Sequence, residues 1–484
     1  MSVKVYEMAE VSFRGPEDGN PFKDVWIVAT VESGERSYAV PGFYDGNGIY
    51  KVRLMPDAEG VYTITLKSND EDLNGKTASV TCSGRSPYLH GPVRAIDEWH
   101  FAYADGTPYY ENGTTCYAWT HQPKELRKRT LRTLKGGPFN KIRFCAFPKH
   151  YRYNENVPEC FVFEGSEEKG FDFTRFNPSF FKTFEDCIES LQKMGIEADI
   201  ILFHPYDRWG FSGMPRETDE FYLRYMVARL WAYGNVWWSF ANEFDFMKEK
   251  TAEDFDLYGT IVQTIDPANH LRSIHNARIF FDHTKPWITH CSIQRYDMQR
   301  IPEWHEQYHK PIVMDEIRYE GDIPNTWGNL TGLQLVDYYW EGLCYGGFCG
   351  HGETYLNPRE ELWWSKGGEL VGSAPKRLAF YNKILAEMPN DFVPGRLGIA
   401  RPCISSPQGI HLYYMGNTQS GEADFTLPDA GLYEADIIDV WHMRITTLKQ
   451  TFEGPEFSVP LPGKPYHAVR LRRIEQIEAS LKED

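Results

Sequence analysis

Two glutamates stand directly after runs of residues that favour β-strands. Glu243 follows residues 236–242, which read VWWSFAN, and Glu316 follows residues 312–315, which read IVMD. Two carboxyl groups in one pocket can cleave a glycosidic bond, because one protonates the leaving oxygen while the other attacks or stabilises the sugar carbon. Neighbouring residues on a strand point to opposite faces, so only one of Asp315 and Glu316 can face such a pocket.

Residues 89–390 alternate short apolar runs with longer amphipathic stretches. Residues 180–194, for example, have apolar side chains at helical spacing and end before Gly195, a typical C-cap. Eight such repeats, with the sixth strand at 287–289, predict a closed (β/α)8 barrel. The alternative, an open doubly wound sheet, is disfavoured because no glycine-rich phosphate-binding motif opens a helix.

The ends of the chain have a different pattern. Residues 1–88 and 391–484 contain runs of β-branched and aromatic residues separated by turn residues, without a long helical period. We therefore predict an α/β protein, with a TIM barrel at 89–390 flanked by two small all-β sandwich domains. Active residues of such barrels lie at the C-terminal ends of the strands. The strands before Glu243 and Glu316 are the fourth and seventh, which face each other across the barrel mouth.

Composition narrows the class of partner. The chain of 484 residues has a net charge of −17, which disfavours nucleic acid and anionic membranes as partners. Aromatic residues make up 15% of it, and their rings suit the apolar faces of sugars. We therefore expect a carbohydrate substrate. Nothing in the composition indicates an oligomeric state.

The cysteines and the N-terminus bear on the compartment and on metals. The nine cysteines include no CxxC pair, so we expect neither a disulfide framework nor a zinc site, and no cofactor. Residues 1–7 lack the basic and apolar pattern of a signal peptide, so a cytoplasmic protein is expected. A secreted protein whose signal has been removed stays an alternative.

One motif points to a different enzyme class. Residues 305–309 read HEQYH and match the HExxH pattern of zinc metalloproteases. That chemistry needs both histidines on one face of a continuing helix, together with a third ligand. Lys310-Pro311 follows at once and ends the helix, so a zinc peptidase is the weaker hypothesis.

The Asn242-Glu243 pair on strand four, together with Glu316 on strand seven, resembles glycoside hydrolase clan A. The segments 113–115 (GTT), 363–368 (WWSKGG) and 461–466 (LPGKPY) are similar to those of a bacterial clan A group with a β-sandwich on each side of the barrel. The barrel is also distantly similar to that of pectin side-chain apiosidases.

The resemblance implies roles for individual residues. Glu243 would be the acid/base, Glu316 the nucleophile, Asn242 a ligand of a sugar hydroxyl and Arg143 a support for the nucleophile. The clan often has a strand-six tyrosine that contacts the nucleophile, and either Gln294 or Tyr296 would take that place. Further substrate contacts are expected from side chains that follow barrel strands or offer an aromatic ring: His204, Tyr206, His275, His351, Glu353, Trp119 and Trp363.

These inferences predict a retaining glycoside hydrolase that uses two glutamates in a double displacement on plant-type oligo- or polysaccharides, with β-linked substrates favoured. The alternative is a carbohydrate-binding protein on a barrel that has lost its activity. The identity of the sugar, the linkage and endo or exo action stay open.

Overall fold

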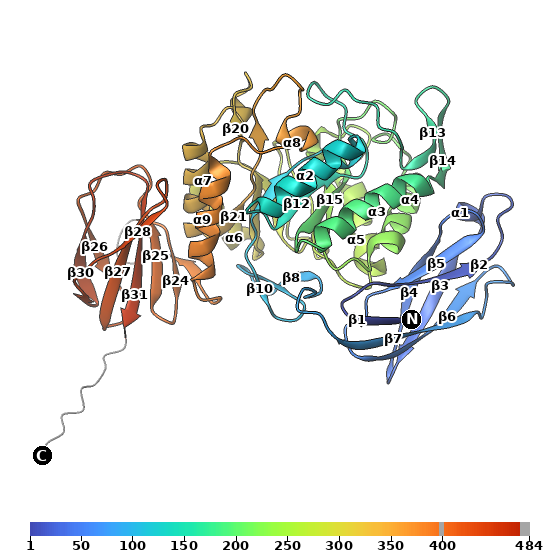
Figure 1. The fold of residues 1–484 in the computed structure, drawn as a ribbon, viewed down its shortest axis with the longest axis horizontal. Helices are drawn as coiled ribbons and strands as arrows, with labels where there is room; N and C mark the ends of the chain where they lie inside the picture. Colours follow the sequence, from blue (N-terminus) through green and yellow to red (C-terminus); the bar gives the residue numbers. More distant parts are fainter. Residues whose placement is uncertain (396–400, 475–484) are drawn as a thin grey trace, which may run out of the picture.

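A computed structural model describes residues 1–395 and 401–474 (Figure 1). The fold is the predicted α/β type, with a central (β/α)8 barrel and a β-sandwich-like unit at each end of the chain. In the described residues, no helix has the length and apolar character needed to cross a bilayer.

Eight parallel strands form the barrel wall. The strands pair in two parallel arcs, and parallel bridges from Thr114 to His351 and from His275 to Ser292 join these arcs into a ring. In chain order the strands are β11 (Gly113–Thr115), β12 (Lys141–Cys145), β15 (Glu197–Phe203), β16 (Val236–Ala241), β17 (Arg272–Ser273), β18 (Cys291–Gln294), β19 (Ile312–Glu316) and β21 (Gly347–Cys349).

Helices cover the outside of this ring (Figure 1). Their apolar faces pack on the strands because a parallel barrel must bury both surfaces of its sheet. They are α2 (Lys124–Gly136), α3 (Pro178–Gln192), α4 (Arg216–Leu230), α5 (Ala252–Ile265), α6 (Ile301–Tyr308), α7 (Gly332–Cys344) and α9 (Ala374–Ala386). Residues 274–290, between β17 and β18, contain no helix.

The sixth strand begins later than the sequence pattern predicts. Residues 287–289 are outside any strand, and β18 starts at Cys291. The reason is Trp287, whose indole nitrogen donates to Asp256 Oδ1 at 2.8 Å. Its ring lies so close to Gly259 on α5 that a Cβ there would be 2.1 Å from it. The run is apolar because it packs against α5, not because it belongs to the barrel wall.

The N-terminal unit is a seven-stranded sheet in the order β1-β7-β6-β3-β4-β5-β2. Its long strand β4 bends from one layer into the other, since its first six residues pair with β3 and its last three pair with β5. The strands are β1 (Ser2–Val5), β2 (Ala9–Arg14), β3 (Ile27–Ser33), β4 (Arg36–Tyr44), β5 (Ile49–Leu54), β6 (Gly60–Ser68) and β7 (Thr77–Arg85). The short antiparallel strands β8 (Val93–Ala95), β9 (Phe101–Tyr103) and β10 (Pro108–Tyr109) lead into the barrel.

A buried ion-pair network fastens the N-terminal unit to the barrel helices. Glu185 on α3 accepts from Arg53 of β5 at 2.8 Å and from Arg229 of α4 at 2.6 Å. Arg229 also pairs with Asp45, which follows β4, at 2.6 Å. The two arginines hold the pKa of Glu185 below its usual range despite the burial that opposes this.

The C-terminal unit is a second sandwich-like arrangement. Its main sheet has the order β23-β24-β25-β31-β27-β28. Strands β26 and β30 pair with each other in a second, two-stranded sheet, and side chains of both sheets form a separate apolar core. The strands are β23 (Val393–Gly395), β24 (Cys403–Ser406), β25 (Ile410–Tyr414), β26 (Glu422–Thr426), β27 (Leu432–Asp439), β28 (Arg444–Thr447), β29 (Phe452–Glu453), β30 (Glu456–Pro460) and β31 (His467–Ile474).

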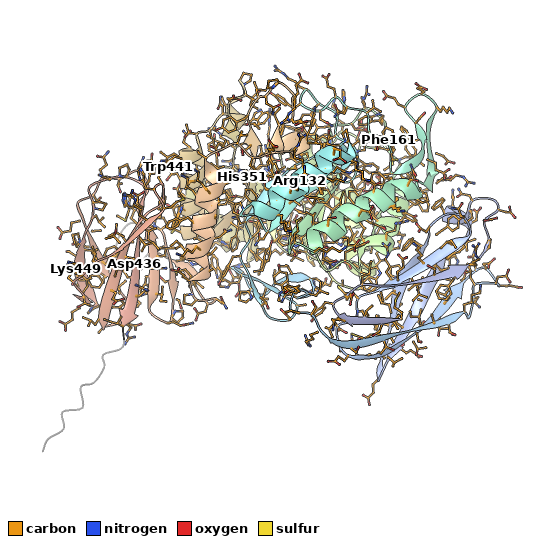
Figure 2. The ribbon with its side chains drawn as sticks, in the orientation of Figure 1. Arg132, Phe161, His351, Asp436, Trp441 and Lys449 are labelled. Atoms are coloured by element: carbon orange, nitrogen blue, oxygen red, sulfur yellow. The ribbon has the colours of Figure 1, made fainter. Side chains whose placement is uncertain are left out.

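Polar contacts join this C-terminal unit to α7 and α9. The hydroxyl of Tyr414 donates to Asp337 Oδ1 at 2.7 Å. The guanidinium of Arg377 lies 3.7 Å from the centre of the Trp441 ring, at the side of the unit that faces the barrel (Figure 2).

Candidate active site

A pocket of about 870 Å³ lies at the C-terminal ends of the barrel strands and contains both candidate glutamates. Glu243 follows β16, the fourth strand, and Glu316 ends β19, the seventh. The volume is in the range of pockets that enclose small organic ligands. Residues from the loops after most barrel strands complete the lining, as expected for this fold.

Glu243 is held in an unusual backbone conformation. Its φ of 54° lies in the left-handed region, which few non-glycine residues adopt and which often marks a functional site. The side chain is 8% exposed. The hydroxyl of Tyr206 donates to its Oε2, and the Asn242 side-chain nitrogen lies 3.4 Å from the same atom. The turn that follows β16 thus presents a fixed carboxyl group to the pocket.

Glu316 lines the same pocket, and its side chain is 12% exposed. The Tyr117 hydroxyl donates to its Oε1. Burial raises the pKa of Glu316 to about 8, and the Tyr319 hydroxyl opposes that rise. His275 Nε2 is 3.9 Å from Oε1, but burial keeps the pKa of His275 well below its usual range, so this histidine is neutral and supplies no counter-charge.

Tyr117 connects the two carboxyl groups. Its hydroxyl contacts Glu316 and lies 2.9 Å from Asn242 Oδ1, while the nitrogen of the same amide faces Glu243. Residues of the first, fourth and seventh strands therefore share one polar chain. The carboxyl groups at its two ends face the same space.

Asp315 points away from this pocket, as alternation along β19 requires. It is buried and accepts from Lys141 Nζ at 2.8 Å, inside the barrel. Arg143 belongs to the same layer, where its guanidinium contacts Asp315 Oδ2 at 3.3 Å and Asn242 Oδ1 at 3.4 Å. The predicted support from Arg143 therefore reaches the site through Asn242, which it orients.

Gln294 and Tyr296 both line the pocket, but in the described residues neither hydrogen-bonds to Glu316. Tyr296 is half exposed, and its ring lies 4.0 Å from the guanidinium of Arg318. The hydroxyl that contacts the proposed nucleophile comes instead from Tyr117, after the first strand.

The predicted aromatic platforms are wrong. Trp119 and Trp363 are almost fully buried, so neither ring offers a face to a sugar. Trp119 packs edge-on against Phe144 under α3, and the Trp363 indole donates to Thr114 Oγ1 at 2.8 Å. The next residue, Trp364, lines the pocket.

Three other predicted contact residues also lie outside the pocket wall. His351 is buried against Phe139, with its Nδ1 2.9 Å from Thr114 Oγ1. His204 is buried and bonds the Phe147 carbonyl at 3.1 Å. Glu353 accepts backbone N–H groups of the loop at 371–372, and burial raises its pKa to about 7. These side chains position loops, so the prediction of direct substrate contact is wrong for them; His275 approaches only through Glu316.

Several residues that line the pocket were not among those predicted from their positions at the C-terminal ends of strands. Tyr117 lies just after β11, so the same reasoning could have found it. Others stand on loops or short helical turns between barrel elements, and no local pattern indicates their side-chain directions: Lys149, Tyr151, Tyr153, Arg318, Tyr319, Trp327 and Trp364.

The HExxH residues do not form a common face. His305 bonds the Gly346 carbonyl at 2.8 Å, on the outside of the barrel. His309 has a φ of 51° just past the end of α6, and its ring faces Glu98 at 3.3 Å. The two rings therefore have different partners, which does not fit the geometry that a zinc peptidase needs.

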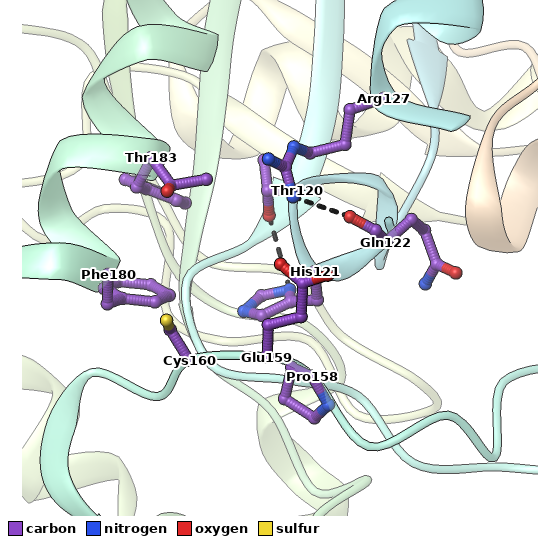
Figure 3. A pocket seen from close by; sticks show the side chains of 10 residues that line it. Thr120, His121, Gln122, Arg127, Pro158, Glu159, Cys160, Phe180 and Thr183 are labelled. Atoms are coloured by element: carbon purple, nitrogen blue, oxygen red, sulfur yellow. Dashed lines mark hydrogen bonds between the residues drawn. The ribbon is translucent and has the colours of Figure 1, made fainter. Parts of the chain in front are cut away.

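A second pocket lies beside His121, between the segment at 119–122 and α3 (Figure 3). Its space of about 30 Å³ holds about two water molecules, which is too little for a sugar. Arg127 closes one side by donating to the Gln122 carbonyl at 2.7 Å. Neither candidate glutamate lines it.

Comparisons with known proteins agree with this geometry. A family model described as "Apiosidase-like, catalytic domain" matches residues 97–359, and two domains of unknown function, DUF5060 and DUF5605, match residues 2–69 and 400–472. No curated protein matches the chain.

Solved structures extend the likeness to the whole chain. The crystal structure of a candidate glycoside hydrolase from Bacteroides vulgatus ATCC 8482 is 35% identical, with a TM-score of 0.93, and the match covers 98% of this chain and 100% of that one. A glycoside hydrolase family 5 structure from the same organism is 14% identical, with a TM-score of 0.63 over 80% of this chain and 94% of that one. The second likeness shows the shared fold.

Proposed function

Because this chain belongs to the apiosidase-like family of glycoside hydrolases, we propose that it is a retaining glycosidase with Glu243 as acid/base and Glu316 as nucleophile. One observation carries the proposal. The two carboxyl groups line one pocket at the ends of the fourth and seventh strands, and Asn242 and Tyr117 link them by hydrogen bonds.

In the first step, Glu243 would give its proton to the glycosidic oxygen while Glu316 attacks the anomeric carbon, so that a glycosyl-enzyme forms and the aglycone leaves. In the second step, Glu243 would take a proton from water, which attacks the same carbon and releases Glu316. Two inversions give net retention. The Tyr206 hydroxyl, which bonds Glu243, fixes the direction of that proton.

Attack requires Glu316 in its ionised form, although burial raises its pKa to about 8. The Tyr117 hydroxyl donates to this carboxyl group and stabilises the ionised form. Positive charge that develops on the sugar ring in the transition state stabilises it further. We therefore propose that Tyr117 has the role of orienting and activating the nucleophile.

The substrate we propose is a β-linked oligosaccharide of plant type. The indole rings of Trp364 and Trp327, whose centres are 4.9 Å apart, form an aromatic corner of the pocket. Such rings bind the C–H faces of pyranose or furanose units.

A panel of nitrophenyl glycosides and oligosaccharides tests the activity, and NMR of the first-formed anomer tests retention. With a substrate identified, azide should restore turnover to E316G and yield a glycosyl azide of inverted configuration, whereas E243Q should form no such product. Inverted product from the wild-type enzyme would refute the double displacement. Sugar binding without hydrolysis of any glycoside would favour a non-catalytic binding protein instead.

A further inference from the structure

The active-site pocket has more positive than negative side chains, although the whole chain carries a net charge of −17. Its carboxyl groups are Glu243, Asp297 and Glu316. Its cations are Lys149, Arg152, Arg278, Arg295 and Arg318. Surplus positive charge in one concave place on an acidic protein attracts anions to that place.

Among the described residues, one of these cations has a carboxylate partner. Arg295 pairs with Asp297 at 2.6 Å. In residues 1–395 and 401–474, no carboxyl oxygen lies within 4 Å of the other four, which we name the cationic wall: Lys149, Arg152, Arg278 and Arg318.

Lys149 is the most deeply placed member of the cationic wall. It is only 2% exposed, and its Nζ lies 3.4 Å from the ring centre of Tyr117 and 4.2 Å from that of Tyr206. These are the tyrosines whose hydroxyls contact Glu316 and Glu243. The ammonium group therefore lies where the sugar unit that reacts must bind.

No hydrogen-bond acceptor contacts this Nζ in the part of the chain that the structure describes. Its main chain is fixed, because Asn154 donates to the Lys149 carbonyl at 2.6 Å. Aromatic faces attract a cation, but they offer no oxygen to its three N–H groups. Lys149 lines the pocket, and burial lowers the pKa of its amino group to about 8, so a ligand that supplies a negatively charged acceptor would favour the charged form.

Binding of a neutral sugar would not offset the free-energy cost of desolvating these cations. Hydroxyl groups can be bound by amides, carboxylates and tyrosines, which the pocket also has, without the cost of desolvating unpaired cations. A carboxylate on the sugar supplies full charges and several acceptor sites to the same wall. The rings of Tyr117 and Tyr206 hold the Lys149 side chain in position to contact that acceptor.

We propose that the cationic wall recognises a carboxylate on the substrate, with Lys149 as its centre, so that the enzyme acts on an acidic sugar of the uronate class. This inference rests on the proposed function, because it assigns the substrate class of the same pocket. It places the uronate carboxylate at the Lys149 ammonium and the anomeric carbon between the two glutamates.

Calorimetric binding to the full chain carrying E316Q tests the idea without turnover. The probes are D-glucuronate and D-galacturonate against D-glucose and D-galactose, with galactose 6-sulfate and sodium sulfate as further anions. We expect uronates to bind at least about tenfold tighter than the matched neutral sugars, as one charge-assisted hydrogen bond allows.

Adding K149M should remove this preference, and adding K149R should retain part of it because the charge stays. K128M is the matched control, since Lys128 on α2 has a half-exposed side chain and pairs with Glu125, so it should leave the preference intact. Thermal unfolding of each variant checks that it folds.

Three outcomes would overturn the inference: equal affinity for uronates and neutral sugars, an unchanged preference in K149M, or binding of the sulfated sugar but not of uronates. The proposed function fails separately. If the chain binds uronates yet hydrolyses no glycoside, the proposed activity is refuted and the anion site stands. If it hydrolyses neutral glycosides and does not bind uronates, the anion site is refuted and the proposed activity stands.

Discussion

The hydroxyl of Tyr117, which follows the first barrel strand, lies 2.9 Å from the side-chain oxygen of Asn242, which follows the fourth, and it shares its single proton between this amide oxygen and Glu316 Oε1. The same hydroxyl contacts Glu316, and the same amide faces Glu243. This pair therefore sets the relative orientation of the two carboxyl groups. Its importance can be measured, because a phenylalanine in place of Tyr117 removes one oxygen and little else.

We expect Y117F to lower kcat/KM by about tenfold to hundredfold, the range for losing a hydrogen bond to a charged group. The loss should appear in kcat, because the bond orients the nucleophile and does not touch the leaving group. Steady-state kinetics on the best substrate measures it. Y110F, which alters a partly buried tyrosine away from the pocket, should have unchanged kinetics. A Y117F enzyme with wild-type kcat would contradict the role.

E316Q should stabilise the protein at alkaline pH. Burial raises the pKa of Glu316 from 4.5 to about 8. Below pH 4.5 this carboxyl group is protonated in both the folded and the unfolded states, so it does not lower the free energy of unfolding. Between pH 4.5 and about 8 the unfolded state ionises first, so the wild type loses up to about 1.4 kcal/mol per pH unit from this group. Glutamine does not ionise and escapes this loss.

The measurement is the melting temperature of both proteins at pH 4.5 and at pH 8.5. The advantage of E316Q should be small at the lower pH and clear at the higher one. E125Q, which changes an exposed glutamate on α2, controls for the general loss of a negative charge. An equal difference between E316Q and wild type at both pH values would refute the raised pKa.

E185Q should weaken the attachment of the N-terminal unit. The substitution leaves Arg53 and Arg229 buried without their shared carboxylate, and breaking a buried pair in this way costs about 3–5 kcal/mol. Urea unfolding measures the loss. R36Q removes an exposed pair with Asp57 and should cost less than about 1 kcal/mol. If both variants lost similar stability, the buried network would not be what joins the two units.

The adjacent tryptophans should separate binding from stability. W364F shrinks a ring that lines the pocket, so KM should rise several-fold; the ring is also only 7% exposed, so the melting temperature should fall as well. W363F removes the indole donor to Thr114 inside the barrel, and it should cost about 2 kcal/mol of unfolding free energy with KM retained. The reverse pattern would mean that Trp363, not Trp364, meets the sugar.

Much of the fold could be predicted from local patterns. The alternation of apolar runs and amphipathic stretches indicated a barrel between two β-rich units, because each period reflects how one element buries its own side chains. The positions of Glu243 and Glu316 followed from the same patterns, since each lies where a strand ends. The prediction of the sixth strand at residues 287–289 was wrong because packing on a helix and pairing in a barrel both favour apolar side chains.

What the sequence alone determined was the barrel and the two glutamates at the ends of opposite strands. Only the tertiary structure decided that Trp364 and not Trp363 lines the pocket, that Tyr117 contacts Glu316, and that the Lys149 amino group meets no acceptor among the residues that the structure describes. Strand ends are local features, whereas the direction of a loop side chain depends on its contacts with loops that are distant in sequence. Those contacts exist only once the barrel has closed.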